Sequence, residues 1–159
     1  MSPVNLGALP SNQPAPTGLC QIKRGAADAQ SVCPANNTAM LDGAGAPMRI
    51  AITPARAGWW VIRAETIFIL ADAAWYYFSW YIQLSPADAN GWSADYSFHC
   101  LHNAVGWRQN AIDAVFLLNA STAYTATMMF NVRQAGTVSY WTGSTYCYIA
   151  GEFIGEGSV

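Results

Sequence analysis

Apolar and polar residues alternate along most of the chain after residue 58. Between Trp60 and Leu70 the even-numbered positions are mostly apolar, whereas Arg63 and Glu65 fall on the opposite face, as in a half-buried strand. The same period of two recurs over residues 74–84, 96–100, 112–118, 124–132, 138–140 and 146–154, with turn residues between the segments. With 48–53 as a lead-in, the pattern predicts about eight antiparallel strands and no long helix. We therefore expect an all-β fold, a sandwich or a barrel, with the jelly-roll β-sandwich as the leading candidate.

The first 58 residues differ in composition from the rest of the chain. They contain no aromatic residue, hold seven of the eight prolines, and show no sustained period of 2 or 3.6. Such a segment has little to bury against its ordering entropy. We therefore predict an extended anchoring arm over residues 1–46 and a jelly-roll domain over residues 47–159, and a tail without function is the alternative. Lys23, Arg24 and Arg49 make this part of the chain basic and are the candidate arm contacts to an acidic neighbouring subunit.

The second long strand carries large side chains on both faces. If its even-numbered residues enter the core, Trp75, Tyr77 and Tyr81 point outward together. Aromatic residues are enriched at protein interfaces because ring and hydroxyl can both be used. We predict a subunit interface here. A second layer of the same domain and a ligand platform for sugars are the alternatives.

Composition restricts the classes of function. Only 10% of residues are charged, 13% are aromatic, and the formal net charge is −2. This composition excludes a disordered chain and a polybasic nucleic-acid binder, and it suits a protein that buries much of its surface in an assembly. The uncharged stretch 73–87 is too short and too polar to span a bilayer, and residues 1–7 lack the pattern of a secretory signal, so we expect neither membrane nor nucleic acid as a partner.

No motif points to catalysis, a metal or a cofactor. There is no G-x-S-x-G, no C-x-x-C and no Gly-rich phosphate loop, so we expect no enzyme activity and no cofactor. His99 and His102 are three residues apart, which places them on opposite faces of a strand, so we predict no metal site there. Cys20 and Cys33 could bridge, but free thiols are expected because nothing indicates an oxidising compartment.

Three segments resemble the trimeric jelly rolls of the C1q and tumour-necrosis-factor class, in the form found in virion proteins of tailed phages. They are ITPARAGWWVI at 52–62, LLNASTAYTA at 117–126 and YCYIAGEFI at 146–154. The first is similar to that family's opening strand, the second to its Leu-x-Leu, turn and aromatic strand, and the third to its last core strand. The chain departs from the family over residues 1–46, where a collagen or coiled-coil stalk is often found.

The resemblance implies a homotrimer in a virion that is assembled in the host cytoplasm. It implies a capsid-decoration or minor capsid protein that clamps neighbouring major capsid subunits, or another virion protein, through its N-terminal arm. The alternative is a receptor- or carbohydrate-binding module at a tail tip or fibre, which would use an exposed aromatic face.

Overall fold

The computed structural model describes residues 20–26, 28–33, 37–71, 75–102, 106–132, 138–143 and 146–157. Within these ranges, the side chains of residues 20–21, 75–76, 98–102 and 132 are not described. The described residues form strands, turns and loops, and they contain no helix that could cross a membrane.

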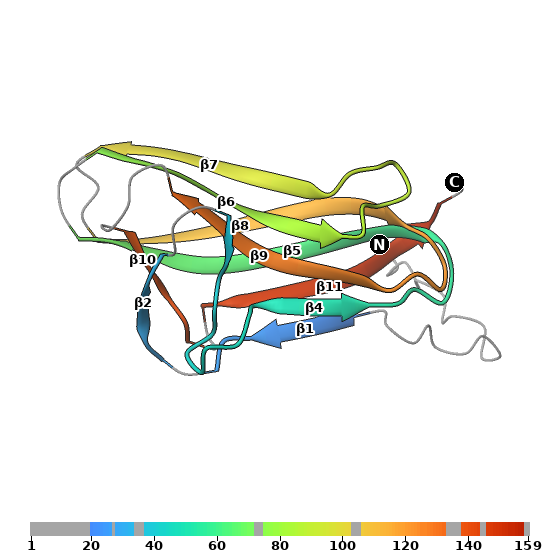
Figure 1. Ribbon diagram of the computed structural model, residues 1–159, viewed down its shortest axis with the longest axis horizontal. Helices are drawn as coiled ribbons and strands as arrows, with labels where there is room; N and C mark the ends of the chain where they lie inside the picture. The colour runs from blue at the N-terminus through green and yellow to red at the C-terminus, as the bar shows by residue number, and fades with distance from the viewer. Residues whose placement is uncertain are drawn as a thin grey trace, which may run out of the picture.

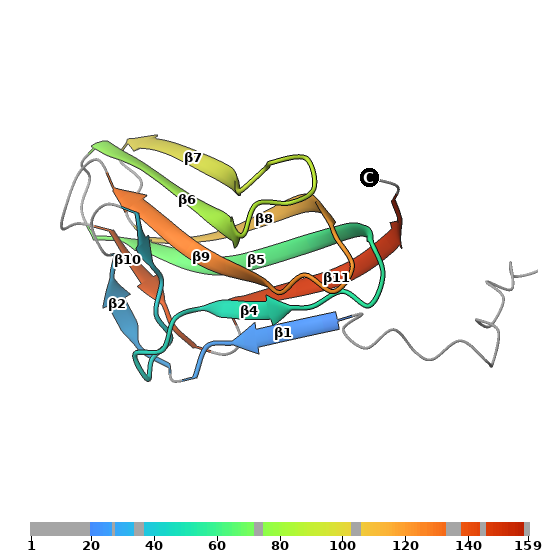
Figure 2. The same cartoon turned by 45° about the vertical axis from the view of Figure 1, so that its right-hand side comes forward.

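Two antiparallel sheets make up the structure, and their long strands run roughly along the long axis of the molecule (Figures 1 and 2). Sheet A contains β1 (Cys20–Arg24), β2 (Gln30–Val32), β5 (Gly58–Leu70), β8 (Gly106–Leu118), β10 (Val138–Trp141) and β11 (Tyr148–Glu156). Sheet B contains β3 (Thr38–Ala39), β4 (Arg49–Ile52), β6 (Trp75–Ser85), β7 (Ala94–His102) and β9 (Tyr124–Val132).

The strand order is that of a jelly roll. In sheet A, β5 pairs with β8 on one side and with β11 and then β10 on the other, and β1 borders β11. In sheet B the order is β4, β9, β6 and β7. The chain crosses repeatedly between two sheets of four principal strands, β1-β11-β5-β8 and β4-β9-β6-β7. The all-β jelly-roll prediction is confirmed, and β4 to β11 correspond to the eight predicted strands.

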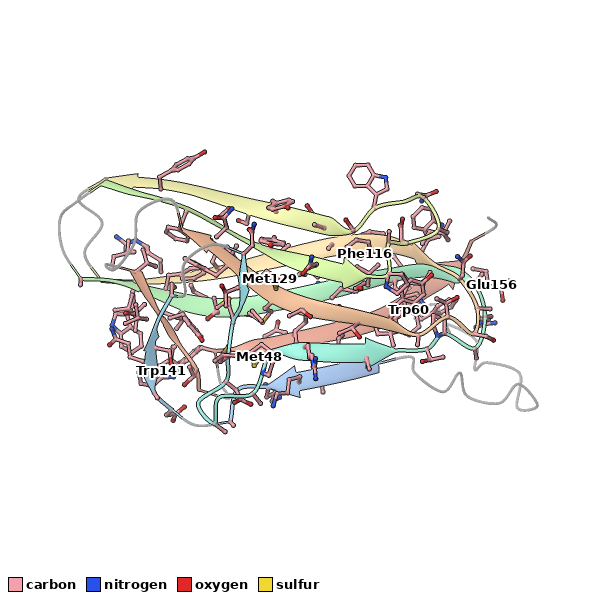
Figure 3. The ribbon with its side chains drawn as sticks, viewed as in Figure 1. Met48, Trp60, Phe116, Met129, Trp141 and Glu156 are labelled. Atoms are coloured by element: carbon pink, nitrogen blue, oxygen red, sulfur yellow. The ribbon has the colours of Figure 1, made fainter. Side chains whose placement is uncertain are left out.

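The core lies between the sheets and is aromatic at its centre. The ring of Phe68 from β5 packs against Phe78, Trp80 and Phe130 of sheet B, with centroids 4.9, 5.6 and 5.6 Å away. The buried indole nitrogen of Trp80 donates a 2.9 Å hydrogen bond to Asn110 Oδ1 on β8, so the polar atom of this ring has a partner. Figure 3 shows further core side chains, labelled at Met48, Trp60 and Phe116.

The described strands between residues 20 and 46 belong to the sandwich, so the predicted boundary after residue 46 is wrong. Strand β1 pairs with β11, β2 with β10 and β3 with β9. The side chain of Met40 is completely buried, and β1 lies beside β4 at the lower side of the sandwich in Figure 1. Backbone hydrogen bonds to a sheet edge do not require aromatic side chains, so the lack of aromatics did not exclude strands. Residues 1–19 lie outside the described residues, and an arm over them stays a prediction.

Candidate interaction surface

The predicted aromatic stripe lies on β6, between β7 and β9. Tyr77 is 41% exposed on the outer face of sheet B. Trp75 pairs with His102 through the backbone, but its side chain lies outside the described residues. One exposed aromatic residue, Tyr77, therefore supports the predicted interface on β6.

Tyr81 is covered, contrary to the expectation that it points outward into solvent. Its side chain is 4% exposed because its ring stacks on Tyr96 at 4.5 Å, and its hydroxyl donates a 3.2 Å hydrogen bond to Asn37 Oδ1. This burial raises the pKa of the Tyr81 phenol above its ordinary value, with the Tyr96 phenol as a second cause. Tyr96, which is 47% exposed, presents its ring to solvent above Tyr81. The sequence could not place Tyr96 over Tyr81 without knowing the register of β6 against β7.

Two of the three predicted arm contacts act within the chain. The ammonium of Lys23 lies 2.6 Å from the buried carboxylate of Asp42, and the guanidinium of Arg24 lies 5.8 Å from the ring centre of Tyr148. Arg49 is exposed on β4, opposite Thr127. Binding of a neighbouring subunit by these three residues stays a prediction.

An apolar patch crosses the outer face of sheet A at one end. Trp107 on β8 and Trp141 on β10 approach from either side of β5, with ring centroids 5.4 Å apart. The register aligns Val32, Ser139, Ile69 and Trp107 in one row across four strands. Trp107 is 54% and Val32 65% exposed. We call Val32, Ile69, Trp107 and Trp141 the indole band. Figure 3 shows Trp141 at the left end of the molecule.

A charged row crosses the same face next to the band. Arg63 on β5 makes two hydrogen bonds to Asp113 on β8, of 2.6 and 2.9 Å, and the Gln109 amide donates to Glu65. The hydrogen bonds from Arg63 lower the pKa of the Asp113 carboxyl, and those to Asp113 raise the pKa of Arg63. A bidentate pair of this kind has a fixed orientation, so the face offers an apolar patch beside an ordered polar border.

The described residues offer no reactive centre. Among the described residues, no group of three His, Cys, Asp or Glu side chains is placed to hold a metal ion. The side chains of His99 and His102 are not among those described. Cys33 and Cys147 are free, buried thiols, so Cys33 does not bridge to Cys20. Burial raises the pKa of Cys147 to about 11 and that of Cys33 above its ordinary value, which opposes formation of a nucleophilic thiolate.

The arrangement of strands defines a jelly-roll β-sandwich, and the comparison with solved structures agrees. The structure of Eiger TNF from S. frugiperda superposes with a TM-score of 0.52 at 8% sequence identity, covering 89% of this chain and 96% of that chain. This likeness shows the fold alone.

Some similar structures belong to larger proteins. They include a protein of infectious bursal disease virus, Gx strain (TM-score 0.44, 14% identity, 87% of this chain and 34% of that chain). They also include an arabinose-bound α-L-arabinofuranosidase (TM-score 0.38, 8% identity, 85% of this chain and 22% of that chain). The chain thus spans only a minor part of either protein. No protein-family model matches the sequence, and no curated protein is significantly similar to it.

Proposed function

We propose that this chain is a self-associating structural protein of a virion, which packs as a homotrimer through the indole band. The observation that carries the proposal is the exposure of Trp107 and Val32 in one apolar patch with Trp141 and Ile69. Exposed aromatic rings on a flat sheet face are enriched at the centres of protein interfaces. The virion context is supported by the resemblance of residues 52–62, 117–126 and 146–154 to phage jelly rolls.

The polar border gives this packing its specificity. A stable interface buries roughly 800 Å² on each partner, with an apolar centre and a polar rim. The indole band supplies the centre, and the row of Arg63, Asp113, Glu65 and Gln109 lies beside it. Because Tyr96 covers Tyr81, we assign the main contact between subunits to the indole band instead of the aromatic stripe on β6. Tyr77 remains a secondary contact.

The anchoring role belongs in this proposal to residues 1–19. Strands β1, β2 and β3 pair within the sandwich, so the segment that could reach a neighbouring major capsid subunit is shorter than the sequence predicted. Residues 1–19 hold four prolines and no charged side chain, so their attachment would rest on backbone and apolar contacts rather than on ion pairs. This composition supports an extended segment that is bound in the assembly.

Light scattering on the purified full chain tests self-association. We expect a mass of about three chains of 17.1 kDa for the natural sequence and a monomer for Trp107→Ala. The matched control is Trp92→Ala, which removes another exposed indole and should leave the trimer intact. A monomeric natural chain at micromolar concentration, or a trimer that survives Trp107→Ala unchanged, would contradict the proposal.

Deletion of residues 1–19 separates anchoring from trimerisation. We expect the shortened protein to remain trimeric and to lose binding to virus particles. Normal decoration of particles by the shortened protein would refute the anchoring role and leave the indole band untouched.

A further inference from the structure

A second surface feature lies at the opposite end of β8. A hollow of about 410 Å³ opens where the end of β8 meets the start of β7 and the loop that precedes it. Its lining is Trp59, Asp88, Asn90, Trp92, Ala94, Asp95, Asp113, Val115 and Phe116. Val115 and Trp107 are eight residues apart on β8, about 26 Å at the usual rise of a strand. Figure 3 shows Phe116 in the right half of the molecule, away from Trp141.

The loop over residues 86–93 is held by one buried carboxylate. Asp88 Oδ1 accepts hydrogen bonds from the backbone N–H groups of Asn90 and Trp92, at 2.9 and 2.8 Å. Asp88 Oδ2 accepts a third, at 3.0 Å, from the backbone of Leu117 on β8. A backbone bond from Ala89 to the carbonyl of Leu117 adds a second tie to the strand edge. The loop is therefore fixed to sheet A without any help from the Trp92 ring.

Trp92 is ordered by its backbone and yet leaves its ring in water. Its side chain is 67% exposed, the largest exposed fraction among the large apolar residues described, and Trp59 on the same hollow is 39% exposed. An exposed indole contributes nothing to the core, so its position is better explained by a contact that the single chain lacks. Because the backbone is already fixed, a ligand would not have to order the loop on binding.

The polar groups of the hollow select the charge of the ligand. No lysine or arginine lines it, which disfavours an anion. Two of its three carboxylates are already compensated, because Asp88 accepts three backbone donors and Asp113 pairs with Arg63. The remaining carboxylate, Asp95, accepts the backbone N–H of Tyr96 at 2.8 Å through Oδ1. What the hollow offers is two indole rings beside a carboxylate and the Asn90 amide.

We propose that this hollow binds a neutral pyranose unit of a glycan. The C–H face of the sugar ring stacks on the Trp92 indole, and its hydroxyl groups, which both donate and accept, bond to Asn90 and Asp95. A cationic ligand would also favour indole and carboxylate, but it would make no use of the Asn90 amide, whose carbonyl and NH₂ groups match sugar hydroxyls. The two indoles of the site lie at the other end of β8 from the indole band, although Asp113 belongs both to the hollow and to the polar border.

The test is binding of the purified full chain to an array of neutral oligosaccharides, followed by calorimetric titration of the best one. We expect Trp92→Ala to weaken binding about tenfold or more, and Asp95→Asn to weaken it by a smaller factor. Tyr146→Ala is the matched control, because it removes an exposed aromatic ring outside both the hollow and the indole band, and it should keep its affinity. Because Trp92 is exposed, its variant should fold, which circular dichroism verifies.

Three results would overturn the proposal. One is the absence of binding to any neutral sugar at millimolar concentration by the natural chain. Another is tighter binding of choline than of any sugar in the same titration, which would make the hollow a cation site. The third is equal loss of affinity in Tyr146→Ala and Trp92→Ala.

Discussion

The body of the sandwich and the segment over residues 20–46 are held in place by different forces. The body buries rings: Phe68, Phe78 and Phe130 contact one another across the two sheets, at centroid distances between 4.9 and 5.6 Å. The segment has no ring to bury, and its strands β1, β2 and β3 are short. The same fold therefore contains one part packed around aromatic rings and one part that combines backbone pairing and polar bonds with the buried side chains of Cys33 and Met40.

Polar anchors fix the segment at a few points. Buried Asp42 accepts hydrogen bonds from the Lys23 ammonium and from the backbone N–H groups of Ala44 and Ala46, at 2.6, 3.0 and 2.9 Å. The Tyr140 hydroxyl bonds the backbone of Leu41 at 2.9 Å. Each of these bonds contributes about 1 kcal/mol, but a buried group that loses its partner costs more. The comparison teaches that a segment without aromatics can still belong to a domain if its backbone finds a sheet edge.

The largest effect is expected in the body. Phe68→Ala should lower the free energy of unfolding by about 3–5 kcal/mol, because the cavity left behind removes contacts with three rings. Urea denaturation measures this difference. The control is Val115→Ala, which shortens an exposed side chain on the neighbouring strand and should change the stability by no more than about 0.5 kcal/mol. A loss below about 1 kcal/mol for Phe68→Ala would argue against the aromatic centre of the core.

A smaller and more local effect is expected in the segment. Asp42→Asn should cost about 1–3 kcal/mol, because it removes the charge that Lys23 and two backbone donors surround. Amide hydrogen exchange should show lost protection around residues 40–48 before any change in β5. Equal loss of protection in both regions would mean that the two parts unfold as one unit.

The same carboxylate gives the segment a pH dependence. The Lys23 hydrogen bond is the largest cause that lowers the pKa of Asp42, and it outweighs burial, which acts in the opposite direction. The stabilisation is therefore present above the unfolded pKa of about 3.9 and is lost as the pH falls through the lower folded pKa. Asp42→Asn should flatten this acid limb of the stability curve, and an unchanged limb would contradict the assignment to Asp42.

Most of the strands could be predicted from sequence, and the failures have physical causes. The period of two located β4 to β11, but β8 begins at Gly106, six residues before the predicted start at 112. Its inward position 110 is an asparagine, which breaks the apolar pattern, and this half-buried side chain accepts a hydrogen bond from the Trp80 indole. Trp107 was missed as a surface residue for this reason, although it shares the exposed face of β8 with Gln109 and Ala111.

Pairings between distant parts of the chain could not be predicted. The indole band depends on β10 and β8 flanking β5, and the hollow depends on Asp88 bonding to Leu117, 29 positions further along the chain. Neither contact leaves a local period or a motif in the sequence. The number of aromatic residues could be read from the sequence. Which of them are exposed, and how they group into two separate surfaces, required the register of the sheets.

The smallest effect is expected on the surface of sheet A, where Arg63 and Asp113 are each about half exposed. Arg63→Gln should cost no more than about 1 kcal/mol, because solvent screens the pair, and the cost should shrink at high salt. A double-mutant cycle with Asp113→Asn measures the coupling directly, and the same cycle on Lys23 and Asp42 supplies the comparison. We expect the larger coupling for Lys23 and Asp42, whose carboxylate is 1% exposed. A larger coupling for Arg63 and Asp113 would mean that the polar border of sheet A is the stronger electrostatic element. The polar anchor of Lys23 and Asp42 would then contribute little to holding the segment over residues 20–46.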